Sequence, residues 1–212
     1  MFVRNRMTAN PFTVTPENTV PEAAAVMAQH SVRHLPVVEG SRVVGVVSGG
    51  DIGKASPSPA TSLSAAEMTY LLGKLKIAKV MTRDPVTISP EALLEEAAVA
   101  MRDNKIEMLP VVENDELVGV ITESAILDAF IELLGFRDHG TRLTVEATDA
   151  PGGLALLAQT TARHRANIQH IAVYRGPDRA TVVVGVNTPN TDALETDLAI
   201  DGFAVIAKLT NP

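Results

Sequence analysis

Short apolar runs alternate with amphipathic stretches in the first part of the chain. Residues 35–38 and 43–47 are apolar runs on either side of a polar turn at 39–42. Runs of this kind have no polar face, which is typical of strands that are covered on both sides. The pattern therefore predicts a β-hairpin whose sheet packs against helices.

An amphipathic helix precedes this hairpin, and a second helix follows it. The first helix opens with Thr19-x-x-Glu22, the spacing of a capping box in which each side chain bonds the other residue's backbone. Its apolar residues recur at helical spacing along one face: Val20, Ala23, Ala24 and Met27. A proline-flanked extended segment at 12–14 comes before the helix, so the unit reads β-α-β-β-α. At about 50 residues, the unit is too small to bury both faces of its sheet alone.

The same unit is written again 74 positions later. The shared positions keep one register: Met7, Pro11, Thr13, Pro16, Met27, Pro36 and Gly45 recur as Met81, Pro85, Thr87, Pro90, Met101, Pro110 and Gly119. The helical face recurs as Leu94, Ala97, Ala98 and Met101. Chance does not explain a gapless alignment at so many positions, so the segment is a duplication. Two copies packed through their sheets about a pseudo-twofold axis would bury what one copy leaves exposed.

Residues 56–75 join the two copies. Ser-Pro-Ser-Pro at 56–59 predicts a loop, and Ser64-x-x-Glu67 predicts the beginning of a connecting helix over 65–75. We interpret the apolar stripe of that helix as core packing rather than as a cofactor site; it consists of Met68, Leu71, Leu72 and Leu75. The predicted domains are repeat 1 at 1–55, the linker and connecting helix at 56–75, and repeat 2 at 76–134.

The register of the repeat is lost in the last third of the chain. A helix at 124–134, ended by Gly135, leads into this part. A strand with alternating Leu143, Val145 and Ala147 comes first. The helix after it has the apolar face Leu154, Leu157, Ala158 and Thr161. Strands at 168–174, 181–186 and 203–209 and a helix at 192–200 complete the order β-α-β-β-α-β, which is ferredoxin-like.

The fold class predicted for the whole chain is α+β (α/β). It consists of tandem β-α-β-β-α repeats with pseudo-twofold symmetry and a C-terminal ferredoxin-like domain at 141–212.

Composition excludes several kinds of partner. The chain has a net charge of −7, its 18 basic residues are spread along it, and aromatic residues make up 3 %. We expect no nucleic-acid partner, because a phosphate-tracking basic stripe and a stacking platform are both missing. The sequence has neither an apolar stretch of membrane-spanning length nor a signal peptide, so we expect a cytoplasmic protein with no membrane partner. With no cysteine and no histidine–carboxylate pair at ligand spacing, a metal site has no support.

The tetrad Ser48-Gly49-Gly50-Asp51 lies between a buried strand and the beginning of a helix. Backbone N–H groups and the helix dipole favour phosphate there, the Ser48 hydroxyl can bond it, and the Asp51 carboxylate can accept both hydroxyls of a ribose. Gly50 and the glycine before it would let a ligand approach the backbone. The same residues also form a Ser-x-x-Asp capping box, which needs no ligand. Both interpretations are open at this point.

Both copies resemble CBS domains, and the duplication resembles a CBS pair, or Bateman module. The resemblance rests on the Met-Thr-x-x-Pro starts, the Leu-Pro-Val-Val hairpins and Gly-Val-Val-Ser-Gly-Gly-Asp at 45–51, and it spans residues 1–130. It implies a non-catalytic regulatory module that binds an adenine nucleotide (AMP, ADP, ATP or a related adenosyl ligand) in the cleft between the repeats. On this interpretation no cofactor is required.

The resemblance also implies which residues hold that ligand. The serine and aspartate of the family's tetrad hold phosphate and ribose, and these are Ser48 and Asp51 here. Residues directly before the Leu-Pro of a repeat touch phosphate or base, which assigns Arg33 and His34 to phosphate. By the same resemblance, the wall around the adenine ring consists of Thr82, Val86, Ile106, Glu107 and Met108.

Copy 2 departs from this pattern. Its tetrad at 122–125 ends in Ala125 instead of an aspartate, and the acidic Glu107 stands where copy 1 has Arg33. A hydrogen bond that involves a charged group contributes about 1.5–3 kcal/mol, so its loss weakens a site about tenfold to a hundredfold. We therefore predict one working site, around the tetrad of copy 1, and one degenerate site.

Residues 141–212 resemble an ACT domain, a small fold that often binds amino acids at subunit interfaces. The resemblance rests on Asp149-x-Pro151-Gly152-x-Leu154 and on Asn167-Ile168, and it implies ligand contacts at Asp149, Gly152 and Asn167. The alternative is that Asp149 caps a helix with Pro151 in its first turn, while Gly152 permits close packing. The order CBS, CBS and ACT with a Ser-Pro linker resembles bacterial acetoin-utilisation-type regulatory proteins.

Three functions compete on these grounds. A nucleotide sensor, with an ACT-like domain for amino-acid sensing or dimer coupling, has the most support, and both resemblances imply a homodimer. An enzyme lacks a nucleophile–base pair and a Walker loop. The remaining alternative is a constitutive dimerisation scaffold whose tetrads only cap helices.

Overall fold

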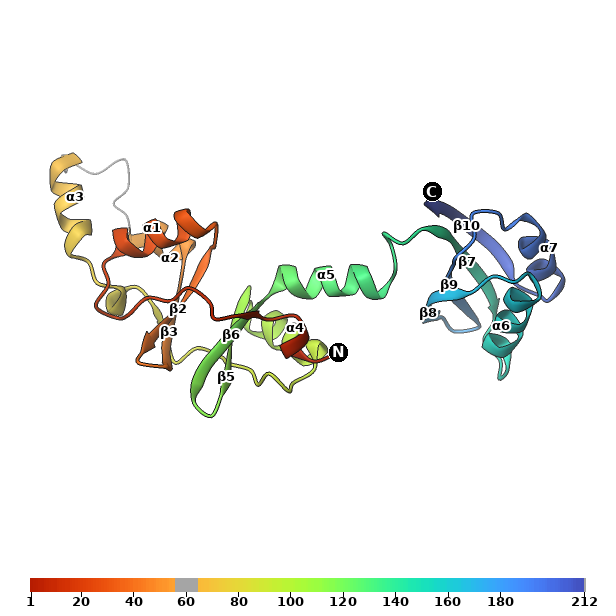
Figure 1. Ribbon diagram of the computed structural model, residues 1–212, viewed down its shortest axis with the longest axis horizontal. Helices are drawn as coiled ribbons and strands as arrows, with labels where there is room; N and C mark the ends of the chain where they lie inside the picture. The colour runs from red at the N-terminus through yellow and green to blue at the C-terminus, as the bar shows by residue number, and fades with distance from the viewer. Residues whose placement is uncertain (56–64, 212) are drawn as a thin grey trace. The chain divides into compact units, whose positions relative to one another are not determined.

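The computed structural model describes residues 1–55 and 65–211. The chain folds into two compact units, Met1–Leu127 and Asp128–Pro212 (Figure 1). The predicted Ser-Pro loop and the Ser64 cap lie outside the described residues. Within the described residues, no helix has the length and apolar content needed to cross a membrane.

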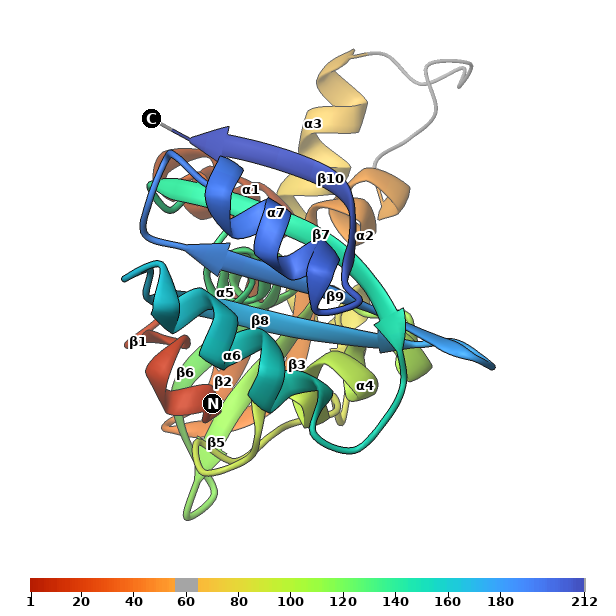
Figure 2. The same ribbon diagram turned by 90° about the vertical axis from the view of Figure 1, so that its right-hand side faces the viewer.

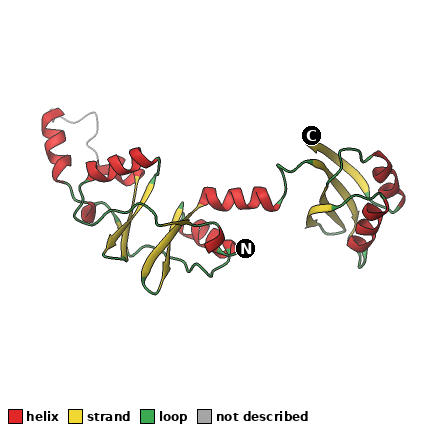
Figure 3. Cartoon of the chain, viewed as in Figure 1, coloured by secondary structure: helices red, strands yellow, loops and turns green. Residues whose placement is uncertain are grey.

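Each copy in the first unit contains a helix, a β-hairpin and a second helix (Figures 1 and 3). Copy 1 consists of α1 (Val20–His30), β2 (His34–Glu39), β3 (Arg42–Ser48) and α2 (Gly49–Ala55). Copy 2 consists of α4 (Leu94–Asn104), β5 (Met108–Glu113), β6 (Glu116–Thr122) and α5 (Glu123–Leu133). The predicted hairpins and helices are therefore present in both copies.

The two hairpins have the same strand register. Pro36 pairs with Val46 in one hairpin, and Pro110 pairs with Val120 in the other. The register also shifts at equivalent places, between residues 37 and 38 and between residues 111 and 112. The extended segments also repeat, because Val14 and Ile88 each form a parallel bridge to their own hairpin. The offset seen in the sequence is thus retained in backbone pairing.

The helices of the two copies begin differently. Thr19 Oγ1 accepts a hydrogen bond from the Glu22 amide at 3.4 Å, and the Thr19 amide donates to Glu22 Oε2 at 2.7 Å. These bonds form the capping box that the sequence predicts. In copy 2 the Leu93 amide donates to Glu96 Oε2 at 2.7 Å, but leucine has no hydroxyl to complete the box.

The copies exchange short N-terminal arms, residues 1–9 and 76–83. The first arm contains η1 (Val3–Asn5) and β1 (Thr8–Ala9), and β1 pairs with β6 of copy 2. The second contains η2 (Ile77–Lys79) and β4 (Thr82–Arg83), and β4 pairs with β3 of copy 1. The resulting sheets are β1-β6-β5 and β2-β3-β4. Each three-stranded sheet therefore takes one strand from the other copy.

The arms are also buried in the core of the copy that receives them. Ile77 has an exposure of 0 % and packs in the cluster of copy 1, while its amide donates to Asn18 O at 2.8 Å. In the same way Val3 is fully buried, and its amide donates to Ala92 O at 2.9 Å. Apolar burial and main-chain hydrogen bonds thus hold both arms in place.

Two equivalent glycines allow the arms to approach the hairpins. A Cβ at Gly45 would lie 2.9 Å from Thr82 O, and a Cβ at Gly119 would lie 2.9 Å from Thr8 O. Both distances are shorter than real Cβ contacts, so only glycine fits without a backbone shift.

The connecting helix is α3 (Ala65–Lys74). Leu72 and Leu75 pack against the core of copy 1, as the sequence predicts. Leu71, which belongs to the same predicted stripe, is 50 % exposed. The face of α3 that packs against the core is therefore narrower than the apolar stripe predicted from the sequence.

The second unit contains one antiparallel sheet with the strand order β10-β7-β9-β8 (Figure 2). Its elements are β7 (Gly140–Thr148), α6 (Gly153–Arg163), β8 (Ile168–Arg175), β9 (Arg179–Val186), α7 (Asp192–Ile200) and β10 (Ala204–Asn211). Helices α6 and α7 cover one face of this sheet (Figure 2). The buried positions of β7 include the predicted Leu143, Val145 and Ala147.

The prediction of which residues form the inner face of α6 is wrong in part. Leu154 is 44 % exposed and Ala158 is also exposed, whereas Leu157, Thr160 and Thr161 are buried. The Thr161 hydroxyl donates to Leu157 O at 2.8 Å, while the Thr160 hydroxyl lies 2.5 Å from Asp201 Oδ2 and 3.0 Å from Leu156 O. Because both hydroxyls have hydrogen-bond partners, two threonines can face the core.

Candidate functional site

Two clefts open on the hairpin ends of the first unit. We call cleft A the cavity of about 590 Å³ whose lining includes His34, Ser48, Asp51, Lys54, Thr82, Asp84, Val86, Asn104, Lys105, Ile106, Glu107 and Met108. We call cleft B the cavity of about 280 Å³ whose lining includes Thr8, Phe12, Val32, Arg33, His34, Leu35, Glu107, Met108, Val120, Thr122, Glu123 and Ser124. A shift of 74 positions relates most of one lining to the other, so the clefts are pseudo-symmetric counterparts.

The copy 1 tetrad is held by reciprocal hydrogen bonds at the edge of cleft A. Ser48 Oγ donates to Asp51 Oδ2 at 2.6 Å, and the Ser48 amide donates to the same oxygen at 2.9 Å. The Asp51 amide donates to Ser48 Oγ at 3.1 Å. These bonds are those of a capping box, and they fix the carboxylate at the beginning of α2.

A main-chain bond places this tetrad beside the residues that precede the hairpin. The Gly49 amide donates to Arg33 O at 2.9 Å, and in copy 2 the Glu123 amide donates to Glu107 O at 2.9 Å. The beginning of the second helix therefore lies next to the beginning of the hairpin in each copy.

The structure brings most of the proposed nucleotide-binding residues together in cleft A. Those that line it are His34, Ser48, Asp51, Thr82, Val86, Ile106, Glu107 and Met108. Arg33 lines cleft B instead, and Gly50 is not in either lining. The assignment of Arg33 to the phosphate of the cleft A ligand therefore lacks geometric support, since Arg33 lines the other cavity.

Cleft A contains two cations that the sequence analysis missed. Lys54 lies one helical turn after Asp51 on α2, and Lys105 ends α4 with a left-handed backbone φ of 56°. Both lysines are exposed, and neither forms an ion pair with another described residue. The i, i+3 spacing of Asp51 and Lys54 on one helix could have pointed to the first of them.

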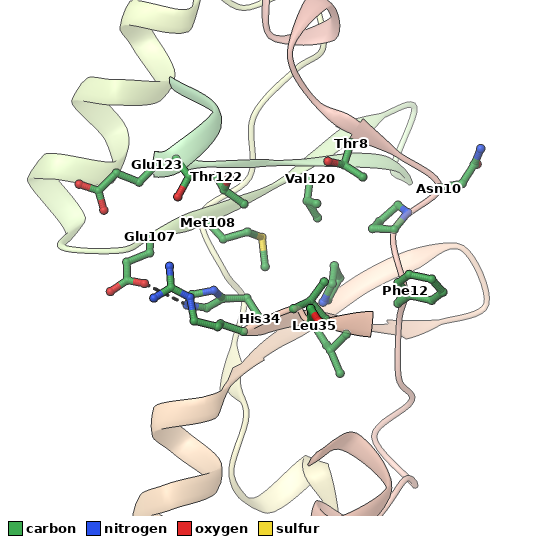
Figure 4. Close-up of a pocket in the computed structure, with 16 residues that line it drawn as sticks. Thr8, Asn10, Phe12, His34, Leu35, Glu107, Met108, Val120, Thr122 and Glu123 are labelled. Atoms are coloured by element: carbon green, nitrogen blue, oxygen red, sulfur yellow. Dashed lines mark ion pairs between the residues drawn. The ribbon is translucent and has the colours of Figure 1, made fainter. Parts of the chain in front are cut away.

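His34, Glu107 and Met108 line both clefts and form a shared wall between them. Figure 4 marks a contact within this wall, in which His34 Nε2 lies 3.8 Å from Glu107 Oε2; it is an ion pair only when the imidazole is protonated. Burial lowers the pKa of His34 below its ordinary value, against the opposing effect of Glu107. Burial therefore favours the uncharged imidazole.

Cleft B has lost the carboxylate that cleft A presents. The Ala125 amide donates to Thr122 Oγ1 at 3.3 Å, which is half of the capping box in copy 1. In addition, the ring of Phe12 stacks on that of His30 with centroids 3.6 Å apart and planes 14° apart. Phe12 occupies the position of Val86 in cleft A, and the smaller volume of cleft B accompanies this exchange.

The site residues proposed for the second unit do not all lie together. Asp149 and Gly152 line a cavity of about 530 Å³, whereas Asn167 is absent from that lining and its amide bonds Asn187 Oδ1 at 2.7 Å. Asp149 does not cap α6, because its Oδ2 lies 3.2 Å from Arg175 Nε. The helix begins after Gly152, whose φ is 89°, so Pro151 also lies outside the first turn.

Two histidines of the second unit lie beside carboxylates. His164 Nε2 lies 2.9 Å from Asp197 Oδ2, and His170 Nε2 lies 3.4 Å from Asp138 Oδ2. Within residues 1–55 and 65–211, no three histidine, aspartate or glutamate side chains gather as a metal-binding group.

Sequence comparison identifies the family of the duplicated part. The CBS domain matches residues 3–58 and 77–132. The CBS domain-containing protein YhcV of Bacillus subtilis is 30 % identical over 142 residues, which are 67 % of this chain and 92 % of that protein. Inosine-5′-monophosphate dehydrogenase of Korarchaeum cryptofilum is 35 % identical over 140 residues, 66 % of this chain but 26 % of the enzyme. The chain thus spans about a quarter of the dehydrogenase.

Solved structures show the same fold. A protein assigned to acetoin utilization (AcuB) from Vibrio cholerae has a TM-score of 0.53 at 32 % identity, over 65 % of this chain and 96 % of that one. CBSX2 in complex with AMP has a TM-score of 0.51 at 28 % identity, over 62 % and 97 %. The CBS domain pair of protein MJ0100, in complex with 5′-methylthioadenosine and S-adenosyl-L-methionine, has a TM-score of 0.51 at 25 % identity, over 61 % and 95 %.

These matches cover both copies and the clefts between them, and the chain therefore belongs to the CBS-domain proteins, as a CBS pair followed by a second unit.

Proposed function

We propose that this protein is a non-catalytic regulatory sensor that binds an adenine nucleotide or related adenosyl ligand in cleft A. The observation that carries the proposal is the convergence on one cavity of the Ser48–Asp51 tetrad, the arm of the other copy and the residues before the second hairpin. The adenosyl ligands of CBSX2 and of the MJ0100 pair support the same class of ligand.

Asp51 is the proposed partner of the ribose. Its Oδ2 accepts bonds from Ser48, and Oδ1 is left to accept from ribose hydroxyls. A carboxylate offers about four acceptor positions, so the cap and a sugar can use it together. On this proposal the capping box and the ligand site are one structure.

Lys54 and Lys105 are the proposed partners of the phosphates, in place of Arg33. They reach cleft A from α2 and from the end of α4, on two different elements. Val86, Ile106 and Met108 provide apolar surface for the adenine ring. The neutral His34 can donate or accept a hydrogen bond at the inner wall.

For the second unit we propose an ACT-like domain with a ferredoxin-like fold, which senses an amino acid or couples the subunits of a homodimer. The element order β-α-β-β-α-β and the antiparallel strand order support this proposal. Asp149 and Gly152 line a cavity that could receive a ligand, whereas Asn167 would have to contribute from elsewhere. We place the protein in the cytoplasm, without a nucleic-acid partner.

A constitutive dimerisation scaffold is the alternative. The observation that favours it is the internal satisfaction of the tetrad, in which Ser48 and Asp51 bond each other without a ligand.

Ligand binding distinguishes the two functions. We would measure the melting temperature with AMP, ADP, ATP and S-adenosylmethionine, and use native mass spectrometry for subunit count and co-purified ligand. A sensor gains about 2.7 kcal/mol of stability at a ligand concentration of 100 times Kd. If none of the four compounds raises the melting temperature and none co-purifies, the scaffold is the correct function.

A further inference from the structure

Cleft B lacks the groups that would hold a sugar phosphate. The equivalents of Asp51 and Lys54 in copy 2 are Ala125 and Asp128. The equivalent of Lys105 in copy 1 is Ser31. The carboxylate for a ribose and both ammonium groups for phosphates are therefore missing.

The same cleft has gained surface for a planar ring. Phe12 replaces Val86, and His30 replaces Asn104. The His30 ring lies against Phe12 at 3.6 Å between centroids, while Phe12 as a whole is still 50 % exposed and lines the cleft. One face of the phenyl ring is thus backed by an imidazole, and that contact restrains the orientation of the ring.

Apolar side chains line the rest of cleft B, and among them Leu35 and Met108 are buried, with exposures of 0 % and 4 %. Figure 4 shows Met108 and Val120 on one strand pair and Leu35 and Phe12 on the other side of the space between them. The volume of cleft B is about 280 Å³, against about 590 Å³ for cleft A. Cleft B therefore offers less room to a ligand than cleft A does.

Among its described lining residues, cleft B has no excess of positive charge. Glu107 and Glu123 line it with Arg33, just as Asp51, Asp84 and Glu107 line cleft A with Lys54 and Lys105. The groups that cleft B lacks, in the described part of the chain, are a second cation and the carboxylate that would hold a ribose. Arg33 and Glu107 offer donors and an acceptor to the polar edge of a heterocycle. An uncharged ring with both kinds of group meets this arrangement better than a polyanion does.

We propose that cleft B is a second binding site, selective for an uncharged planar heterocycle of nucleobase size without its sugar phosphate. The two clefts of one CBS pair would then bind different chemical classes: a nucleotide in cleft A and a bare ring in cleft B. This inference is separate from the proposed nucleotide site, because the residues that decide it, Phe12 and Ala125, do not line cleft A.

Isothermal titration with two probes, free adenine and AMP, tests the proposal on the full chain. In an Asp51→Ala background, which weakens cleft A, adenine binding should persist with an unchanged Kd. Adding Phe12→Val should weaken adenine about tenfold or more, the lower range of what one stacked aromatic ring contributes to base binding. Valine is the natural residue at the equivalent position of copy 2, so this variant is expected to fold. Phe12→Val alone should leave AMP binding to cleft A unchanged.

Several results would overturn the inference. Adenine binding could be absent, could disappear with Asp51→Ala, or could be insensitive to Phe12→Val. The inference would also be contradicted if AMP bound the Asp51→Ala protein as tightly as adenine does and Phe12→Val weakened that AMP binding. If AMP binds but adenine does not, this inference fails alone, and if adenine binds at Phe12 but no nucleotide binds, the proposed nucleotide site fails alone.

Discussion

Cleft A and cleft B are built on the same backbone and present different side chains. Both hairpins pair in the same register, and both contain the glycine that admits the opposite arm. At the ligand-facing positions the copies differ in charge and ring content, most clearly at Asp51 against Ala125 and Val86 against Phe12. Positions that make the fold are therefore shared, whereas positions that face a ligand have diverged.

The largest expected difference between the clefts comes from one carboxylate. Asp51→Ala should weaken nucleotide binding about tenfold to a hundredfold, because a hydrogen bond to a charged group contributes about 1.5–3 kcal/mol. Isothermal titration with the nucleotide that stabilises the native protein measures the effect. Asp51→Asn is the matched control for folding, since an amide oxygen can still accept from the Ser48 amide.

A nucleotide affinity that stays the same in both variants would remove Asp51 from the site. The reciprocal Ala125→Asp is expected to give cleft B much less affinity for nucleotide than cleft A has. The two lysines of cleft A are still absent there.

The fold-making glycines should behave alike in both copies. Gly45→Ala and Gly119→Ala should each lower the free energy of unfolding by about 1–3 kcal/mol, because each new methyl group meets a backbone oxygen. Chemical denaturation measures both. Gly53→Ala in α2 is the control: its Cβ would meet nothing within 4 Å, so a gain of up to about 1 kcal/mol is expected. A large cost at one glycine and none at the other would contradict the equivalence of the two arms.

The helix caps should differ in a smaller way. Thr19→Ala removes a hydroxyl that accepts from the Glu22 amide, and it should cost about 1 kcal/mol of stability. The exposed Thr13, replaced by alanine, should change stability by less than about 0.5 kcal/mol. Thermal unfolding compares the two variants, and equal effects would show that the cap contributes nothing.

The lysines of cleft A should have the smallest effect. Lys54→Gln and Lys105→Gln should each weaken ATP binding about twofold to fivefold, since exposed charge pairs contribute little. AMP should be affected less, and the loss should shrink as salt concentration rises. Titrations at two ionic strengths test this, with the exposed Lys74→Gln as a control outside the cleft. Equal losses for AMP and ATP would mean that the lysines do not meet the additional phosphates.

The periodicity of apolar residues and the spacing of polar ones were sufficient to predict the elements of the repeats and the capping box of the tetrad. The hairpins are long enough to show their apolar pattern, and the capping boxes of Thr19 and Ser48 follow from three-residue spacing. The exchange of arms could not be predicted in this way. A two-residue strand such as β4 has no periodicity, and its partner β3 lies far away in sequence.

The side chains that enter each cleft were harder to assign. Arg33 directly precedes β2, and His34 is the first residue of that strand. Arg33 lines cleft B alone, whereas His34 lines both clefts, and no periodicity in the sequence separates two adjacent residues in this way. The inner face of α6 differs from its prediction for another reason. The hydroxyls of Thr160 and Thr161 have hydrogen-bond partners, and this permits a burial of threonine that hydrophobicity alone does not indicate.

The exchanged arms also constrain how such a chain could have arisen. A precursor with a single copy would lack the edge strand and the buried Val3 or Ile77 that the other copy now provides. It could complete its sheet only by taking the arm of a second molecule, as a domain-swapped dimer. Fusion of two such copies makes this exchange intramolecular, so it no longer depends on protein concentration. Once both arms were supplied within one chain, a substitution at a residue that lines one cleft alone, such as Phe12, no longer recurred in the other cleft, and the two clefts could acquire different ligands.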